Sequence, residues 1–286
     1  MMRTAIIPER FEIMTDHTSG RLPLAMLLLA GMFPSHLPSF QVNSNGVPKP
    51  QDIAFTAQCD GTEQRYVLLL PRGFDAGRTH DVLIALHGYL SDRWQFMRPT
   101  RDETRAVLDV AVRHDLILVT PDYRVKSWMG PQAEADVTQI ISDLKTRYRI
   151  GKVFLCGASL GGSAALTYAA LHPNLIDGVA SMNGTANYLE PVSFPDVVAV
   201  SFGGTLQQIP LEYKLRSAEY WPERFTMPVS IVASGGDTVV PPQSVLRLAA
   251  VLERLGGRIQ LIFREKEGHK TVYADAVAAL EFAISP

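Results

Sequence analysis

The sequence predicts an α/β fold in which a mostly parallel central sheet carries helices on both faces. From residue 65 onward, short apolar runs alternate with amphipathic segments of about 13 to 17 residues. The apolar runs are nearly continuous rather than alternating, which is typical of strands buried on both faces of a parallel sheet. The chain has 286 residues, 47% of them hydrophobic and 20% charged, and this globular composition excludes wholesale disorder, collagen and coiled coil.

The first half of this pattern predicts three strands and two helices. Tyr66–Leu70 and Val82–Leu86 combine aliphatic residues with β-branched or aromatic ones, as strands do. Thr100–His114 repeats its apolar residues at helical spacing, and Leu116–Thr120 is an apolar run that ends at a proline. Gln132–Tyr148 is the clearest helix because its apolar residues share one face.

The second half predicts strands that end at glycine or polar residues and helices that end before Gly or Pro. The elements are strand Val153–Cys156, helix Ser159–Leu171, strands Gly178–Met182 and Val229–Ala233, helix Pro241–Leu255, strand Ile259–Phe263 and helix Thr271–Ile284. The stretch 184–227 is long for a plain connection, so we expect a small cap or a pocket-lining excursion around these residues.

We expect residues 1–50 to lie outside the catalytic domain, which we place at residues 51–286. Leu22–Phe33 is an apolar run too short to span a bilayer, which takes about 20 residues. Its length is typical of a signal peptide, and residues 34–50 are rich in Pro, Ser and Asn, as linkers are. Two interpretations stay open: export, giving a secreted or periplasmic protein, and a cytoplasmic protein with a hydrophobic or disordered N-terminal arm.

Charge and cysteine content exclude several function classes. The formal net charge is −2, so the chain has no basic field to neutralise phosphates, and we expect no nucleic-acid partner. Two cysteines cannot build a disulfide scaffold or a four-thiolate zinc site. A bridge between Cys59 and Cys156 is formally allowed, but Cys156 lies in an apolar run, which favours a buried free thiol.

A nucleophile motif stands at one predicted strand-to-helix junction. The strand Val153–Cys156 runs directly into Gly157-Ala158-Ser159-Leu160-Gly161, which matches G-x-S-x-G, and the next helix follows at once. The serine of this motif must lie on a sharp turn, and the flanking glycines give the crossing backbones room. A phosphate-binding loop is disfavoured because no Lys-Ser or Lys-Thr follows the glycines. Ser159 is therefore the predicted nucleophile.

A serine nucleophile needs a histidine base and a carboxylate that orients the histidine. His269 lies between the last strand and the last helix, and Asp237 follows the strand Val229–Ala233. Both residues are expected at the carboxyl edge of the sheet, where Ser159 also lies. Three other acidic residues are weaker candidates for the acid because none of them directly follows a predicted strand. They are Asp196, Glu190 and Asp177.

On these residues the chain resembles the α/β-hydrolase superfamily, and within it the small esterases and the prolyl-oligopeptidase-like serine hydrolase domains. The resemblance covers roughly residues 64–284 and includes Leu86-His87-Gly88-Tyr89, the glycine-flanked serine, Gly235-Gly236-Asp237 and Gly268-His269. It implies an oxyanion hole built from the backbone N–H groups of Tyr89 and Leu160. It also implies that His87 is structural and steadies its loop.

The resemblance implies a serine hydrolase that cleaves carboxylic esters through a Ser-His-Asp triad and an acyl-enzyme intermediate. The lack of a His-Gly-Gly-Gly motif disfavours the lipase branch, and the lack of a recognisable propeller favours an esterase over an oligopeptidase. The alternative is a serine peptidase that acts on short peptides. No metal or organic cofactor is expected, and the expected partner is a small-molecule ester substrate. We expect no stable membrane span, and the oligomeric state is not predicted.

The pocket is expected to be shaped by two segments. One is the loop Asp122–Gly130, and the other is the aromatic-rich excursion 184–227. At the start of the second segment, Asn183-Gly184-Thr185 matches a glycosylation sequon, but its place at the end of a strand favours a role in the wall of the site.

Overall fold

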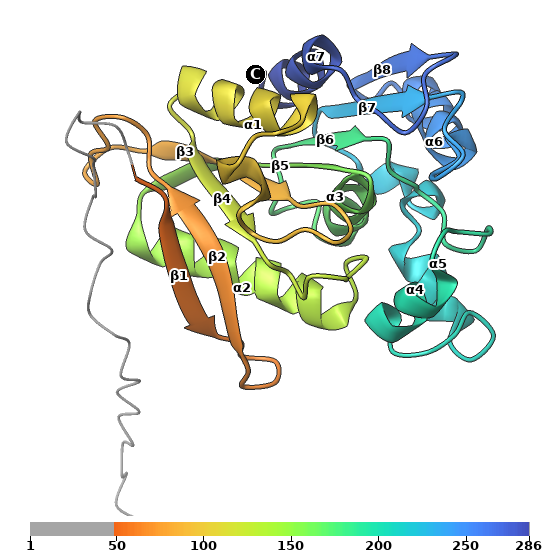
Figure 1. Cartoon of the computed structure of the whole chain (residues 1–286), viewed down its shortest axis with the longest axis horizontal. Helices are drawn as coiled ribbons and strands as arrows, with labels where there is room; N and C mark the ends of the chain where they lie inside the picture. The colour runs from red at the N-terminus through yellow and green to blue at the C-terminus, as the bar shows by residue number, and fades with distance from the viewer. Residues whose placement is uncertain (1–48, 286) are drawn as a thin grey trace, which may run out of the picture. The chain divides into compact units, whose positions relative to one another are not determined.

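The computed structural model describes residues 49–285, which form an eight-stranded sheet with helices on both faces (Figure 1). The strand order is β1-β2-β4-β3-β5-β6-β7-β8. The strands are β1 (Gln51–Thr56), β2 (Glu63–Leu69), β3 (His80–Leu86), β4 (Ile117–Pro121), β5 (Ile150–Ala158), β6 (Gly178–Met182), β7 (Val229–Ser234) and β8 (Ile259–Arg264). The pairs β1–β2 and β2–β4 are antiparallel and all other pairs are parallel, which confirms the predicted fold class.

Seven α-helices and three short 3₁₀ segments connect the strands within the described residues. The helices are α1 (Asp102–Arg113), α2 (Pro131–Arg147), α3 (Leu160–Leu171), α4 (Pro195–Phe202), α5 (Pro210–Arg216), α6 (Gln243–Arg254) and α7 (Tyr273–Ile284). The 3₁₀ segments are Gln95–Met97, Ala218–Tyr220 and Pro222–Arg224.

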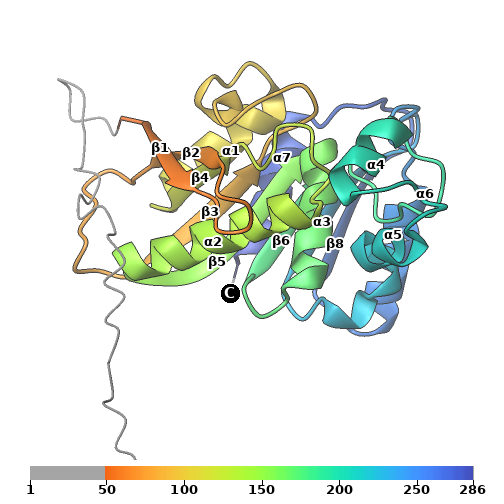
Figure 2. The same cartoon turned by 90° about the horizontal axis from the view of Figure 1, so that it is seen from below.

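Successive side chains of each strand point to opposite faces of the sheet, so the hydrophobic core forms two layers. On β3, Ile84 packs in the layer that contains α2, α3 and α6, whereas Leu83 packs in the layer that contains α1 and α7. Figure 2 shows the sheet with these helices on its two faces. All five residues Val82 to Leu86 are buried, which explains why the strand reads as a continuous apolar run.

The antiparallel edge of the sheet begins earlier than the sequence pattern predicts. The prediction placed the first strand at Tyr66–Leu70, but β1 already pairs with β2 from Gln51 opposite Leu68 to Thr56 opposite Glu63. β1 is an edge strand whose residues alternate between covered and exposed, so it lacks an apolar run. Ion pairs hold it in place: Asp52 contacts Arg93 at 2.8 Å and Arg65 at 3.2 Å.

The predicted excursion 184–227 folds into α4, α5 and two 3₁₀ segments that extend the α2–α3–α6 layer. Its interior is aromatic: the rings of Tyr188 and Phe202 lie 5.1 Å apart, and those of Phe202 and Tyr213 lie 4.9 Å apart. Most of its aromatic residues therefore stabilise the excursion itself. Phe194 is 44% exposed and remains available to the site.

Both cysteines are free, since Cys59 is exposed and Cys156 is buried. Burial raises the pKa of the Cys156 thiol well above its ordinary value, so this thiol is inert. The hydrophobic run Leu22–Phe33 lies outside the described residues. Between residues 49 and 285, no helix is long and apolar enough to cross a membrane.

Candidate active site

Ser159 lies on the turn between β5 and α3, at the carboxyl edge of the sheet. Its backbone has φ 57° and ψ −121°, a conformation that a residue with a Cβ adopts only under strain. Its N–H donates to the carbonyl of Met182 at 2.8 Å, which ties the turn to the neighbouring strand β6. The turn therefore raises the serine side chain above the sheet at the first turn of a helix.

The glycines around Ser159 are required by close contacts between backbones. A Cβ added at Gly161 would lie 2.0 Å from the carbonyl oxygen of Leu86, at the end of β3. A Cβ added at Gly157 would lie 2.4 Å from the carbonyl of Gly161. The two glycines thus allow β5, α3 and β3 to meet at one point.

The three residues singled out as nucleophile, base and acid form one hydrogen-bonded chain. His269 Nε2 lies 2.9 Å from Ser159 Oγ, and His269 Nδ1 lies 2.6 Å from Asp237 Oδ2. The side chain of Asp237 is 1% exposed, whereas that of His269 is 26% exposed. The imidazole thus stands between a buried carboxylate and a hydroxyl that solvent can reach.

The carboxylate of Asp237 is held on both of its oxygens. Oδ1 accepts hydrogen bonds from the backbone N–H groups of Val239 and Val240, each at 2.9 Å. Oδ2 faces His269 and lies 3.5 Å from the amide nitrogen of Asn183. These contacts orient the carboxylate toward Nδ1.

The weaker candidates for the acid are used elsewhere. Asp177 accepts a hydrogen bond from the backbone N–H of Val153 at 2.8 Å. Glu190 forms an ion pair with Arg247 at 2.5 Å. Asp196 lies in the first turn of α4. The described structure gives none of the three a hydrogen bond to His269.

Two backbone N–H groups near Ser159 donate to no atom of the described residues. They belong to Tyr89, which follows β3, and to Leu160, the first residue of α3. The neighbouring N–H of Gly88 is already used, since it donates to Gln95 Oε1 at 2.8 Å. Tyr89 and Leu160 thus bring two free donors to the pocket that contains Ser159, as an oxyanion hole requires.

His87 is fully buried, and each of its two ring nitrogens lies against a backbone carbonyl. Nδ1 lies 2.9 Å from the carbonyl of Gly88, and Nε2 lies 3.0 Å from that of Asp122. Tyr123 Oη donates to the carbonyl of His87 at 2.5 Å. His87 therefore joins the loop after β3 to the loop after β4.

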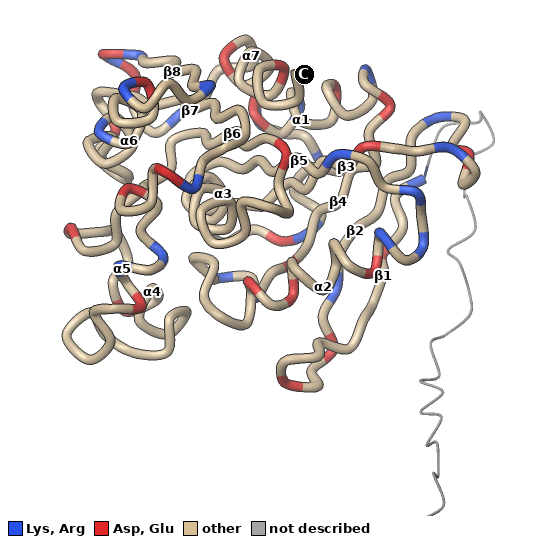
Figure 3. Tube along the Cα trace, turned by 180° about the vertical axis from the view of Figure 1, so that it is seen from behind, with Lys and Arg blue, Asp and Glu red and all other residues tan. Residues whose placement is uncertain are grey.

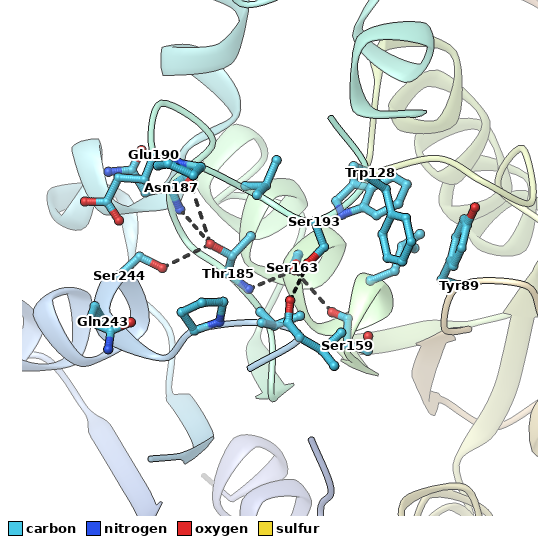
Figure 4. Close-up of a pocket in the computed structure, with 17 residues that line it drawn as sticks. Tyr89, Trp128, Ser159, Ser163, Thr185, Asn187, Glu190, Ser193, Gln243 and Ser244 are labelled. Carbon is cyan, nitrogen blue, oxygen red and sulfur yellow. Dashed lines mark hydrogen bonds between the residues drawn. The ribbon is translucent and has the colours of Figure 1, made fainter. Parts of the chain in front are cut away.

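A narrow pocket opens beside Ser159 and has a cavity volume of about 60 Å³, room for about four or five water-sized groups. Figure 4 shows Tyr89 and Trp128 on one side of Ser159, and Asn187 and Ser244 on the other. The ring of Phe194 stacks on that of Tyr89 at 4.6 Å. The pocket therefore has an aromatic wall and a polar end.

A second, wide pocket of about 670 Å³ also borders Ser159. His269 and Lys270 line it from the β8–α7 loop, and Gln95, Arg101 and Glu103 line it from the segment before and at the start of α1. Burial raises the pKa of Glu103. Ser159 therefore lines both pockets, which offer separate spaces for the two parts of a substrate.

Some residues of the site have no signature in the sequence. Thr271 Oγ1 donates to Asn183 Oδ1 at 2.5 Å, and Asn183 Nδ2 donates to Ser234 Oγ at 2.9 Å, so these side chains form a layer under the triad. The position of Asn183 at the end of β6 is the one available signal, and its burial leaves no room for a glycan there. Between residues 49 and 285, no group of three or more His, Cys, Asp or Glu side chains could hold a metal ion.

Comparisons with known proteins place the chain in a family. Residues 122–283 match the prolyl oligopeptidase family. No curated protein sequence matches the chain. The matched part starts in the loop after β4 and includes Ser159, Asp237 and His269.

Solved structures share the fold at low sequence identity. FphF, a fluorophosphonate-binding serine hydrolase of Staphylococcus aureus, has a TM-score of 0.63 and 18% identity, over 82% of this chain and 96% of that chain. A putative dipeptidyl aminopeptidase IV from Bacteroides ovatus has a TM-score of 0.66 and 14% identity, over 82% of this chain and 34% of that chain. A puromycin hydrolase has a TM-score of 0.65 and 18% identity, over 84% of this chain and 39% of that chain.

These structures include both free-standing hydrolases and longer peptidases, and this chain spans about a third of the dipeptidyl aminopeptidase. At such identities the likeness shows the fold, and the sequence match shows the family. The chain belongs to the prolyl oligopeptidase family and is a serine hydrolase of the α/β-hydrolase superfamily.

Proposed function

We propose that the chain is an esterase that cleaves small carboxylic esters through an acyl-enzyme intermediate. Ser159 is the nucleophile, His269 the general base, Asp237 the residue that orients the base, and Tyr89 and Leu160 the oxyanion donors. The observation that carries the proposal is the hydrogen-bonded chain Ser159–His269–Asp237, with 2.9 Å and 2.6 Å between the paired atoms.

Acylation follows from this geometry. His269 Nε2 takes the proton of Ser159 Oγ as the oxygen attacks the ester carbonyl. The N–H groups of Tyr89 and Leu160 donate to the oxyanion that forms. Asp237 holds the proton on Nδ1 and stabilises the imidazolium, which then protonates the departing alkoxide from Nε2.

Deacylation repeats these steps with water. His269 is 26% exposed, so a water molecule can approach Nε2 from the wide pocket once the alcohol has left. Nε2 takes a proton from this water as its oxygen attacks the acyl carbon, and then returns the proton to Ser159 Oγ as the acid leaves.

The pocket sizes support a small acyl group. The narrow pocket has a cavity volume of about 60 Å³ and an aromatic wall, so it suits a short acyl chain. The wide pocket has the room for the alcohol. We therefore expect kcat/KM to fall as the acyl chain is lengthened beyond a few carbons.

The experiment is an ester panel run beside a peptide amide. Phenyl esters of increasing acyl length are compared with a short peptide p-nitroanilide, each with wild type and with Ser159→Ala. The proposal predicts Ser159-dependent turnover of the short esters and much slower turnover of the amide. Turnover of the amide at a rate equal to or above that of the esters contradicts the ester assignment.

A serine peptidase that acts on short peptides is the alternative, and the family match favours it. The same triad and oxyanion donors would serve an amide, with His269 protonating the amine that leaves. The amide arm of the panel distinguishes the two functions.

We also propose that the apolar run Leu22–Phe33 directs export, which would make the mature enzyme secreted or periplasmic. Support comes from the length of the run alone. A native N-terminus beyond residue 33, found by mass spectrometry, is the expected result, and an intact N-terminus in a cytoplasmic fraction is the contrary one.

A further inference from the structure

The wide pocket beside Ser159 continues into a groove whose charged residues are mostly cationic. The groove has a volume of about 790 Å³ and shares Gly88, Gln95 and Arg101 with the wide pocket. Arg98, Arg101 and Lys126 line it, and we call these three residues with the space between them the cationic groove. In Figure 3 the acidic and basic residues are intermixed along the trace.

The cations of this groove are largely unpaired. Within the described chain, Arg98 and Lys126 have no carboxylate within 4.0 Å, and Arg101 has only Glu103, at 3.8 Å. The neighbouring Arg93 differs, since it binds Asp52 and Asp122, each at 2.8 Å. Arg98 and Lys126 therefore remain available to a ligand, and Arg101 is held only by its distant contact with Glu103.

One acidic side chain, Asp92, opposes them among the described residues that line the groove. Its Oδ1 accepts a hydrogen bond from the backbone N–H of Trp94 at 2.8 Å. The guanidinium carbon of Arg98 lies 5.7 Å from the ring centre of Trp94, a contact that limits the motion of Arg98. The sum of the lining charges is thus positive, and one of the cations is positioned by an aromatic ring.

The loop that carries Lys126 is strained and firmly anchored. Tyr123, Arg124 and Val125 have φ values of 28°, 68° and 56°, which is costly for a β-branched residue such as Val125. Arg124 anchors the loop through ion pairs with Asp60 at 2.8 Å and Asp136 at 2.5 Å. The strained turn leaves Lys126 exposed at the groove, a position that core packing does not require.

We propose that the cationic groove binds a negatively charged group, a carboxylate or a phosphate, on the leaving group of the substrate. The inference rests on the proposed ester function and adds its substrate class. The narrow pocket holds the acyl side, so the anion belongs to the part of the substrate that extends from Ser159 through the wide pocket. Exposed cations beside a cleft raise the local concentration of anionic substrates.

The test compares phenyl acetates that differ only in charge far from the scissile bond. Each phenol carries a para side chain that ends in a carboxylate, a phosphate, a neutral amide or a trimethylammonium group. The proposal predicts the highest kcat/KM for an anionic ester and the lowest for the cationic one. Comparison of the carboxylate with the phosphate identifies the preferred anion.

Substitutions then assign the preference to the groove. The double variant Arg98→Gln/Lys126→Gln is expected to lower the ratio of anionic to neutral kcat/KM roughly tenfold, because each exposed charge contributes a factor of roughly two to five. Lys145→Gln/Arg254→Gln removes two exposed charges that line none of these pockets, so it matches the change in net charge and should leave the ratio unchanged.

A third variant should change the ratio of anionic to neutral kcat/KM in the opposite direction. Asp92→Asn keeps an acceptor for Trp94 but removes the opposing charge, so the ratio should rise. Salt at about 0.5 M should lower the ratio in wild type by screening these exposed charges.

The two possible failures are distinguishable. A wild-type enzyme that turns over none of the acetates contradicts the proposed ester function. Equal kcat/KM for anionic and neutral acetates, unchanged in the double variant, overturns the anion subsite while the ester function stands.

Discussion

The strain at Ser159 and the reactivity proposed for it are consequences of the same turn. With φ at 57°, the residue directs its hydroxyl toward His269 and leaves the N–H of the next residue free. The glycines on either side have no Cβ, so the strand, the helix and β3 can approach closely enough to hold this turn. The strain is thus maintained by close backbone packing that the two glycines of the G-x-S-x-G motif allow.

The first prediction concerns Asp237. Replacement by Asn keeps the volume but places an N–H₂ donor or a neutral oxygen opposite His269 Nδ1, which favours the wrong tautomer of the imidazole. We expect kcat to fall on the order of 10⁴-fold. The measurement is steady-state turnover of a short phenyl ester.

Asp196→Asn is the matched control, since Asp196 lies in α4 with no hydrogen bond to His269. Its kcat should stay within a few-fold of wild type. The reverse order of the two variants would assign the acid to another residue.

The second prediction concerns Gly161. Its Cβ in an alanine variant would lie 2.0 Å from the carbonyl oxygen of Leu86, and that oxygen is backbone that cannot move aside. We expect Gly161→Ala to lower the free energy of unfolding by about 2 kcal/mol or more. Chemical denaturation measures the change.

Gly77→Ala provides the comparison, because its nearest atom is a flexible carboxylate oxygen of Asp75 at 3.2 Å. A Gly161→Ala variant as stable as Gly77→Ala would mean that the turn at Ser159 is looser than described.

The predictable part of the site consisted of residues that follow strands or match a local motif. Ser159, Asp237 and His269 stand at the ends of β5, β7 and β8, so the fold class alone places them at one edge. The bonds among Thr271, Asn183 and Ser234 were not predictable. They join residues as far as 88 positions apart, and no spacing rule connects such pairs.

Among the secondary-structure elements, the sequence pattern located the apolar strands well and the polar strands poorly. The interior strands β3, β4, β6 and β7 match their predicted ranges to within two residues at each end. β5 extends from Ile150 to Ala158 beyond the apolar core that predicts it, because exposed Gly151 and Lys152 interrupt the hydrophobic signal. β1 was missed altogether, since it pairs on one side only and half of it faces solvent.

The third prediction concerns the anchoring of β1. The pKa of the Asp52 carboxyl group is lowered, mainly by its hydrogen bond with Arg93. The hydrogen bond with Arg65 adds to the effect. A carboxyl group whose pKa is lower in the folded state stabilises the fold at pH values above its ordinary pKa of 3.8. This stabilisation is lost as the pH falls through the folded-state pKa. Asp52→Asn should therefore lower Tm near neutral pH and have a progressively smaller effect as the pH falls below 3.8.

Thermal melts of wild type and Asp52→Asn at a series of pH values measure this difference. A Tm difference that is constant or grows toward acid pH would show that the ion pair does not anchor β1.

At the scale of the whole molecule, the sheet order explains why one edge carries the site. The strands β3, β5, β6, β7 and β8 run parallel, so their carboxyl ends bring Tyr89, Ser159, Asn183, Asp237 and His269 to the same side. The remaining loops at that side form the narrow pocket, the wide pocket and the cationic groove. The loops therefore determine which substrate fits, whereas the sheet positions the residues proposed to react with it.

The fourth prediction concerns residues 1–46. The described domain begins at Lys49, and β1 starts at Gln51, so a chain that begins at Val47 retains every described element. We expect the shortened chain to be soluble, with unchanged kcat/KM and a Tm close to that of the full chain. Aggregation or a much lower Tm would instead indicate that the hydrophobic run stabilises the domain.

The most direct test of the account is covalent labelling of the full chain with a fluorophosphonate, followed by peptide mass spectrometry. An activated serine attacks this probe at phosphorus and displaces fluoride, so one adduct is expected, on Ser159. His269→Ala should slow its formation by orders of magnitude. The absence of an adduct on Ser159, or labelling at equal rate without His269, would contradict the central claim that Ser159, His269 and Asp237 act as one catalytic unit.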